Sequence, residues 1–105
     1  SFRMSMRLTD LDINFDFNER TFVNKYGRSM SGPKKFTLLV AFKSKGKEEV
    51  EVPLNEIEAM WNRMKSLLGG EFNRFYSNTA KTEGRVDSKK KGFYELTDSW
   101  KEIFS

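Results

Sequence analysis

The central third of the chain carries the most regular pattern of apolar and polar positions. Residues 36–42 are apolar on both alternating faces, which predicts a central β-strand that is covered on both sides. Val50 and Val52 alternate with glutamates, the pattern of a second strand with one face in water. Gly46 lies between the two segments and can adopt the positive φ of a tight turn. We therefore expect these two strands to form a hairpin.

Residues 55–68 show the clearest helical pattern. Asn55 is a favourable N-cap, and Glu58 completes a capping-box-like pair with it. Gly69 stands where a left-handed residue commonly ends a helix. Large apolar side chains recur every three or four residues and form one stripe, which we expect to lie in the core. Its members are Ile57, Met60, Trp61, Met64, Leu67 and Leu68.

The flanking segments predict further sheet, a loop and a second helix. Apolar residues alternate with Asp and Asn over residues 11–17, which predicts a half-buried strand, and residues 21–26 predict another. Residues 71–76 fit either a helical turn or a short strand. Residues 77–92 contain only two apolar side chains and predict a mobile basic loop. The end of the chain predicts a short helix, because apolar residues recur there at helical spacing: Phe93, Leu96, Trp100, Ile103 and Phe104.

These elements predict one α+β domain over residues 7–105. We expect a twisted antiparallel sheet of about four strands, with the helix over residues 55–68 packed on one face and a short C-terminal helix. Residues 1–6 are interpreted as an expression remnant outside the domain. Over residues 11–68 the element order, the basic hairpins and the strand–Pro–helix junction resemble the single-stranded nucleic-acid binders of the PUR family. That resemblance implies a preference for single strands.

Composition narrows the possible chemistry. The 105 residues contain no Cys and no His, so the thiolate nucleophile, the usual general base and the commonest zinc ligand are all missing. We therefore expect a non-enzymatic protein with no cofactor and no metal site. The absence of Cys fits a reducing, cytoplasmic location. No apolar run approaches the ~20 residues of a membrane span, so no membrane partner is expected.

Basic residues are unevenly distributed in this chain of net charge +4. Residues 25–47 contain seven Lys or Arg and no Asp or Glu. The predicted hairpin would bring them together as a phosphate-binding surface beside one aromatic ring for base stacking. These candidates are Lys25, Tyr26, Arg28, Lys34, Lys35, Lys43, Lys45 and Lys47. The predicted basic loop adds Arg85, Lys89, Lys90 and Lys91.

The sequence therefore predicts a small nucleic-acid-binding module, such as an accessory protein of a phage or mobile element. Single-stranded DNA or RNA is favoured over duplex. The alternative is a protein-interaction module, acting as an inhibitor, an adaptor or an oligomeric subunit. It would bind a partner or a second copy through the apolar end of the chain, at Phe93, Trp100, Ile103 and Phe104. The sequence leaves open whether that end is core or interface.

Overall fold

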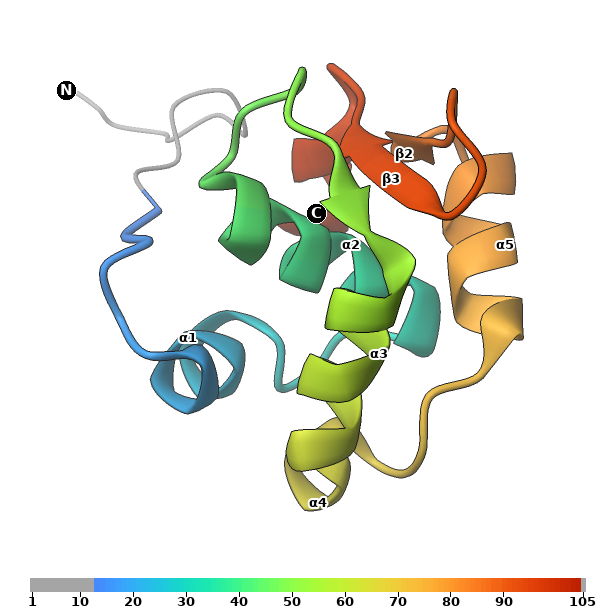
Figure 1. Ribbon diagram of the computed structural model, residues 1–105. Helices are drawn as coiled ribbons and strands as arrows, with labels where there is room; N and C mark the ends of the chain where they lie inside the picture. Colours follow the sequence, from blue (N-terminus) through green and yellow to red (C-terminus); the bar gives the residue numbers. More distant parts are fainter. Residues whose placement is uncertain (1–12, 105) are drawn as a thin grey trace, which may run out of the picture.

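The computed structural model describes residues 13–104, of which 53% are helical and 9% are in strands (Figure 1). The helices are α1 (Glu19–Tyr26), α2 (Gly32–Ser44), α3 (Leu54–Arg63), α4 (Lys65–Leu68) and α5 (Arg74–Thr82). The strands are β1 (Val52–Pro53), β2 (Val86–Asp87) and β3 (Phe93–Leu96), and a 3-10 helix, η2, spans Trp100–Phe104. The predictions for residues 1–12, including the expression remnant, lie outside the described residues.

The predicted sheet of about four strands is wrong, because the chain forms a small sheet of three. The strand order is β1-β3-β2, and both pairings are antiparallel. Val52 pairs with Tyr94, and Val86 pairs with Leu96. The sheet lies at one end of the molecule, while α3, α4 and α5 extend away from it (Figure 1). Most of the core is consequently formed between helices.

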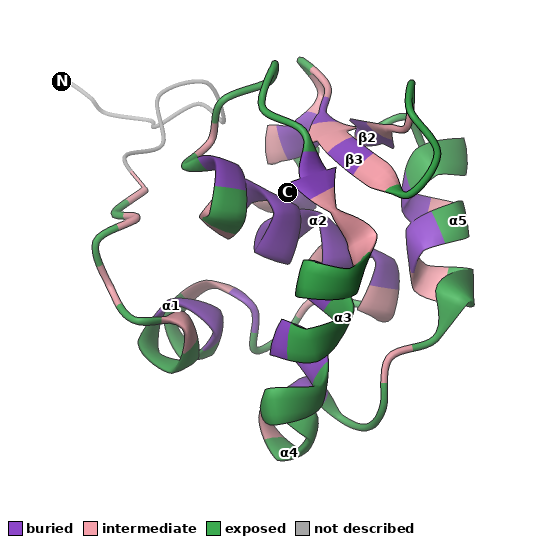
Figure 2. Ribbon diagram, viewed as in Figure 1, coloured by how far each residue is buried: buried purple, intermediate pink, exposed green. Residues whose placement is uncertain are grey.

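The predicted strand over residues 36–42 is instead the centre of α2. Residues 36–41 are all buried, because α2 is surrounded by α1, α3, α5, the sheet and η2 (Figure 2). An apolar run of this length fits a buried strand and a buried helix equally well, since neither leaves a polar face. Lys45 (φ 56°) and Gly46 (φ 77°) do adopt left-handed conformations, but they end a helix and do not turn a hairpin.

The strand predictions before residue 27 are also wrong, although the expected burial pattern is present. Ile13, Phe15 and Phe17 are half-buried against the core and the residues between them are exposed, yet residues 13–18 pair with no strand. Residues 21–26 belong to α1. The Asn18 side chain caps this helix by accepting a hydrogen bond from the Thr21 backbone N–H at 2.8 Å.

The helix predicted over residues 55–68 is confirmed as α3 and α4, with a break at Met64. The helix begins after Pro53, so Asn55 is not its N-cap, and Gly69 ends α4 with a φ of 88° as expected. The stripe is core: Leu67 is partly buried and the other five members are buried. Trp61 stacks on Tyr76 with 5.0 Å between ring centroids.

Half of the segment predicted as a loop over residues 77–92 belongs to regular elements. It contains the end of α5 and all of β2, which leaves a connection of residues 88–92 between β2 and β3. The predicted C-terminal helix is β3 followed by η2. Trp100 and Ile103 are 3% and 2% exposed, so the end of the chain packs into its own core. Among residues 13–104, no helix is long and apolar enough to cross a membrane.

Candidate nucleic-acid interface

The basic residues between positions 25 and 47 do not converge on one surface. The predicted hairpin would have brought these residues together. The segment forms α2 instead, and this helix separates the basic residues before it from those after it. Lys34 and Lys43 are nine residues apart on α2, which corresponds to about 14 Å along the helix axis. Lys45 and Lys47 lie beyond the helix end, whereas Lys25 and Arg28 precede its start. The predicted phosphate-binding cluster is therefore dispersed.

Several members of this group also have partners within the protein. The Lys35 ammonium donates to the Leu68 carbonyl at 3.3 Å, and Lys43 lies 3.7 Å from the carboxylate of Glu56. Lys25 lies over the rings of Phe17 and Tyr26. These contacts tie three of the seven cations to the protein itself.

The predicted stacking residue Tyr26 is half-buried. Its ring packs on Phe22, with 4.9 Å between centroids, and its hydroxyl accepts a hydrogen bond from the Asn14 backbone N–H at 3.0 Å. Its remaining edge lines a small pocket of about 150 Å³ together with Lys34 and Phe104. Tyr26 thus lacks the open ring face that base stacking requires.

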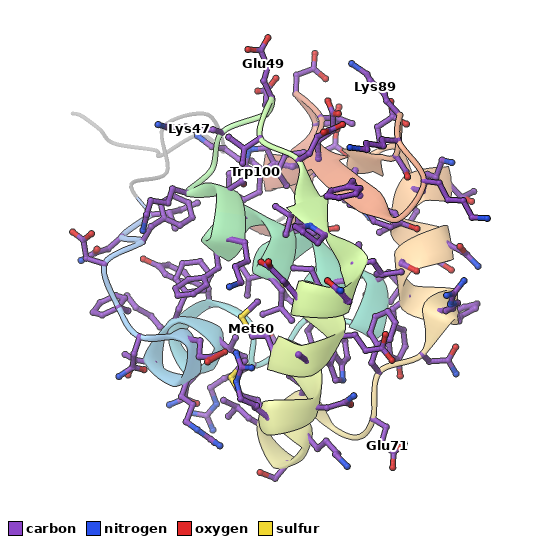
Figure 3. All side chains as sticks on the ribbon, in the orientation of Figure 1. Lys47, Glu49, Met60, Glu71, Lys89 and Trp100 are labelled. Atoms are coloured by element: carbon purple, nitrogen blue, oxygen red, sulfur yellow. The ribbon has the colours of Figure 1, made fainter. Side chains whose placement is uncertain are left out.

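The second predicted group lies around the β2–β3 hairpin, but its members differ in accessibility. Arg85 forms an ion pair with Glu83, and only 16% of its side chain is exposed. Lys89 pairs with Glu95 at 3.5 Å. The Lys90 ammonium lies over the ring of Phe93, at 4.6 Å from its centroid, and Lys91 is exposed. Figure 3 shows Lys89 on the hairpin and Lys47 well separated from it across the molecule.

Lys91 belongs to a cationic groove between α5 and the 88–92 connection. The groove has a volume of about 420 Å³. Leu54 and Tyr94 line it along with residues from α5 and the connection. Its full lining is Leu54, Arg74, Lys81, Ser88, Lys91, Gly92 and Tyr94. Arg74 and Lys81 are seven residues apart, or two helical turns, so both side chains lie on one face of α5, about 10 Å apart along its axis.

Local packing fixes both walls of the groove. The Asn73 side chain accepts a hydrogen bond from the Phe75 backbone N–H at 2.8 Å and starts α5. Ser77 and Ala80 are buried against the core, which turns the opposite face of α5 outward. On the other wall, the Leu54 backbone N–H donates to the Gly92 carbonyl at 2.8 Å and ties the connection to the start of α3.

The groove keeps its positive charge because its cations lack acidic partners. Arg74, Lys81 and Lys91 form no ion pair with any carboxylate of residues 13–104. The sequence of α5 contains no Asp or Glu. A separate groove of about 250 Å³ is acidic instead, and its lining includes Glu48, Glu49, Asp87, Lys89 and Glu95. An anion is therefore attracted to the α5 groove and repelled from the acidic one.

Arg74 and Lys81 were not among the residues predicted from the sequence. They fall in segments that the sequence pattern leaves undecided or predicts as loop, because the buried face of α5 consists of small and hydroxyl side chains and carries no large apolar stripe. A signal was nevertheless present. Asn73 is a good N-cap, Tyr76 and Ala80 follow at helical spacing, and residues 71–83 contain neither Gly nor Pro.

Over residues 13–104, no cluster of three or more acidic side chains could hold a metal ion. Comparison of the chain with protein-family models, with curated proteins and with solved structures found no match.

Proposed function

We propose that this protein is a non-enzymatic module that binds duplex DNA through α5 and the 88–92 connection. The observation that carries the proposal is the cationic groove. Arg74, Lys81 and Lys91 come from two separate segments, line one surface groove and have no carboxylate partner among the described residues. Cations without a carboxylate partner can neutralise phosphates, and this releases the counterions condensed on the nucleic acid.

The order of the elements supports the same proposal. α3 and α4 lead through a turn containing Gly69 and Gly70 into α5, in the manner of a helix-turn-helix unit. The β2–β3 hairpin follows directly, as the wing does in winged helix-turn-helix domains. In a helix-turn-helix protein the second helix enters the major groove of DNA, and its exposed residues contact the bases. α5 is the corresponding helix here, and its outer face is open to solvent (Figure 2).

Duplex is preferred to single strands because the chain offers little for stacking bases. Binders of single strands stack successive bases on several aromatic rings beside a basic track. Among residues 13–104, Phe75 is the one strongly exposed large aromatic side chain, at 61% exposure. Tyr26 is half-buried, and α2 occupies the place of the predicted basic hairpin, so neither feature favours single strands.

The alternative of a protein-interaction module receives less support. Its main argument was the apolar end of the chain, where Trp100 and Ile103 are buried in the core cluster. Phe104 is half-buried against the same core, whereas Phe93 is half-buried with the Lys90 ammonium over its ring. A partner could reach Trp100 or Ile103 only if η2 detached from the core.

The proposal is tested by measuring the affinity for a fluorescent 20-base-pair duplex over a series of salt concentrations. Lys81→Glu is compared with Lys47→Glu, which makes the same change in net charge at an exposed site outside the groove (Figure 3). We expect Lys81→Glu to weaken binding by roughly tenfold and to reduce the slope of log affinity against log salt by about 1. Lys47→Glu should change both quantities little.

Two results would overturn the proposal. One is the absence of duplex binding at low salt. The other is equal weakening by the two substitutions, since binding would then follow net charge and not the groove. Tighter binding to an unstructured single strand of the same length would restore the preference inferred from the sequence.

A further inference from the structure

The outer face of α5 carries more than phosphate-binding cations. At 100° per residue, Asn78 lies at the centre of the exposed face. Arg74 and Lys81 lie on the side toward the groove, and Phe75 and Thr82 lie on the opposite side. All five side chains are exposed.

Phe75 has no structural reason to be exposed on this face. Its ring is 61% exposed, and among residues 13–104 the next most exposed large hydrophobic residue is Val50, at 38%. Its ring contact is with Tyr76, at 6.2 Å between centroids. An apolar side chain this exposed contributes little to folding, so a ligand that covers it would account for its position.

Asn78 is equally unengaged. Its amide makes no hydrogen bond to any residue of the described part of the chain, although it sits in the middle of a well-formed helix. Asn is a weak helix former, so a stabilising role for it at this exposed position is not evident. An amide presents one donor and one acceptor side by side, which matches the edge of adenine in the major groove.

We propose that α5 reads A·T base pairs in the major groove, with Asn78 hydrogen-bonded to adenine and Phe75 packed on a thymine methyl group. This inference rests on the proposed function. Asn78 would donate to adenine N7 and accept from the N6 amino group. Residues three apart on a helix have Cβ atoms about 5–6 Å apart, so the two side chains reach the same or adjacent base pairs of a duplex with a 3.4 Å rise.

The remaining residues of this face have a complementary role. Arg74 and Lys81 hold the phosphates on the side of the hairpin, which positions α5 without reading sequence. Within α5 no carboxylate is present to accept a hydrogen bond from cytosine N4, the contact that would select a C·G pair. The face therefore offers no carboxylate acceptor for the cytosine amino group.

The test begins with selection of binding sites from duplexes that carry a randomised 12-base-pair segment. We expect enrichment of sites with an A·T pair flanked by a second A·T pair. The selected site is then compared with a scrambled duplex for the full chain and for Asn78→Ala. The ratio of the two affinities should fall by about 5- to 150-fold in the variant, while the salt slope stays unchanged.

Base analogues separate the two contacts. Replacing adenine by 7-deazaadenine should weaken binding of the unmodified protein but not of Asn78→Ala. Replacing thymine by uracil, which lacks the methyl group, should weaken binding of the unmodified protein but not of Phe75→Ala. Asn24→Ala, at an exposed Asn on α1, is the matched control and should retain sensitivity to both analogues.

The outcomes distinguish this inference from the proposed function. Salt-dependent duplex binding without any enriched sequence overturns base reading and leaves the proposed function standing. Enrichment that survives in both Asn78→Ala and Phe75→Ala likewise overturns it. If the protein binds no duplex at all, both proposals fail together.

Discussion

At the scale of single residues, Gly32 lies where α2 packs closely against Tyr76 of α5. A Cβ atom at this position would lie 2.3 Å from the Cε1 atom of Tyr76. The tyrosine ring has little freedom to move, because it stacks on Trp61, which is itself buried. The absence of a side chain at Gly32 therefore allows α2 to support the helix that lines the cationic groove.

Gly32→Ala is expected to destabilise the fold by about 1–3 kcal/mol, the usual cost of inserting a methyl group into a packed site. The free energy of unfolding from chemical denaturation measures this. Ser31→Ala is the control, since Ser31 is exposed and its side chain forms no capping hydrogen bond. Equal stability of Gly32→Ala and the unmodified chain would contradict this prediction, because it would show that the Tyr76 ring moves aside at little cost in free energy.

At the scale of elements, an exposed ion pair and a buried ring are among the contacts that attach α1 to the rest of the chain. Arg63 forms a double hydrogen bond with the Glu19 carboxylate, at 3.0 and 3.1 Å from its Nη2, but its side chain is 56% exposed. Phe22, by contrast, is fully buried against Phe15, Tyr26 and Phe42. Exposed ion pairs contribute little to stability, whereas buried rings contribute several kcal/mol.

Glu19→Gln is therefore expected to cost less than about 1 kcal/mol of unfolding free energy, with the difference shrinking at high salt. Phe22→Ala is expected to cost about 3–5 kcal/mol. Glu58→Gln, at an exposed glutamate of α3 for which the described residues provide no ion pair, controls for the loss of one negative charge. A larger cost for Glu19→Gln than for Phe22→Ala would reverse this order.

The C-terminal element makes a separate prediction. Trp100 and Ile103 are buried in η2, so a chain that ends at Thr97 should lose cooperative unfolding as measured by circular dichroism. Light scattering on the full chain and on the shortened chain tests whether this segment is a protein–protein interface. A shortened chain that stays folded but changes its oligomeric state would make the segment an interface.

The elements also show what the sequence could and could not predict. The stripe from Ile57 to Leu68 was correctly assigned to a helix and to the core, since its spacing fits a helix alone. Residues 36–42 were assigned to a strand, although they belong to α2. A run with no polar face shows neither the helical nor the strand periodicity, and a Gly after it fits a helix cap as well as a hairpin turn. α5 was missed because its buried face is built from Ser77 and Ala80, which carry almost no hydrophobic signal. Because α5 was not predicted, Arg74 and Lys81 were not predicted as site residues either.

At the scale of the whole molecule, the β2–β3 hairpin lies between two grooves of opposite charge. The α5 groove contains Arg74, Lys81 and Lys91, and the acidic groove contains Glu48, Glu49, Asp87 and Glu95. Under the proposed function, this separation would orient the protein on a polyanion, because only one of the two grooves attracts it. The net charge of +4 alone would not specify a binding face.

The most direct measurement of this account is an NMR titration of the full chain with a short duplex, following the backbone amide signals. We predict that the perturbed amides cluster on α5 and on residues 88–92, and that they return toward their free positions as salt is added. Perturbations centred instead on the loops around Arg28 and Lys47, or a spectrum unchanged at low salt, would contradict the assignment of the α5 groove as the DNA-binding surface.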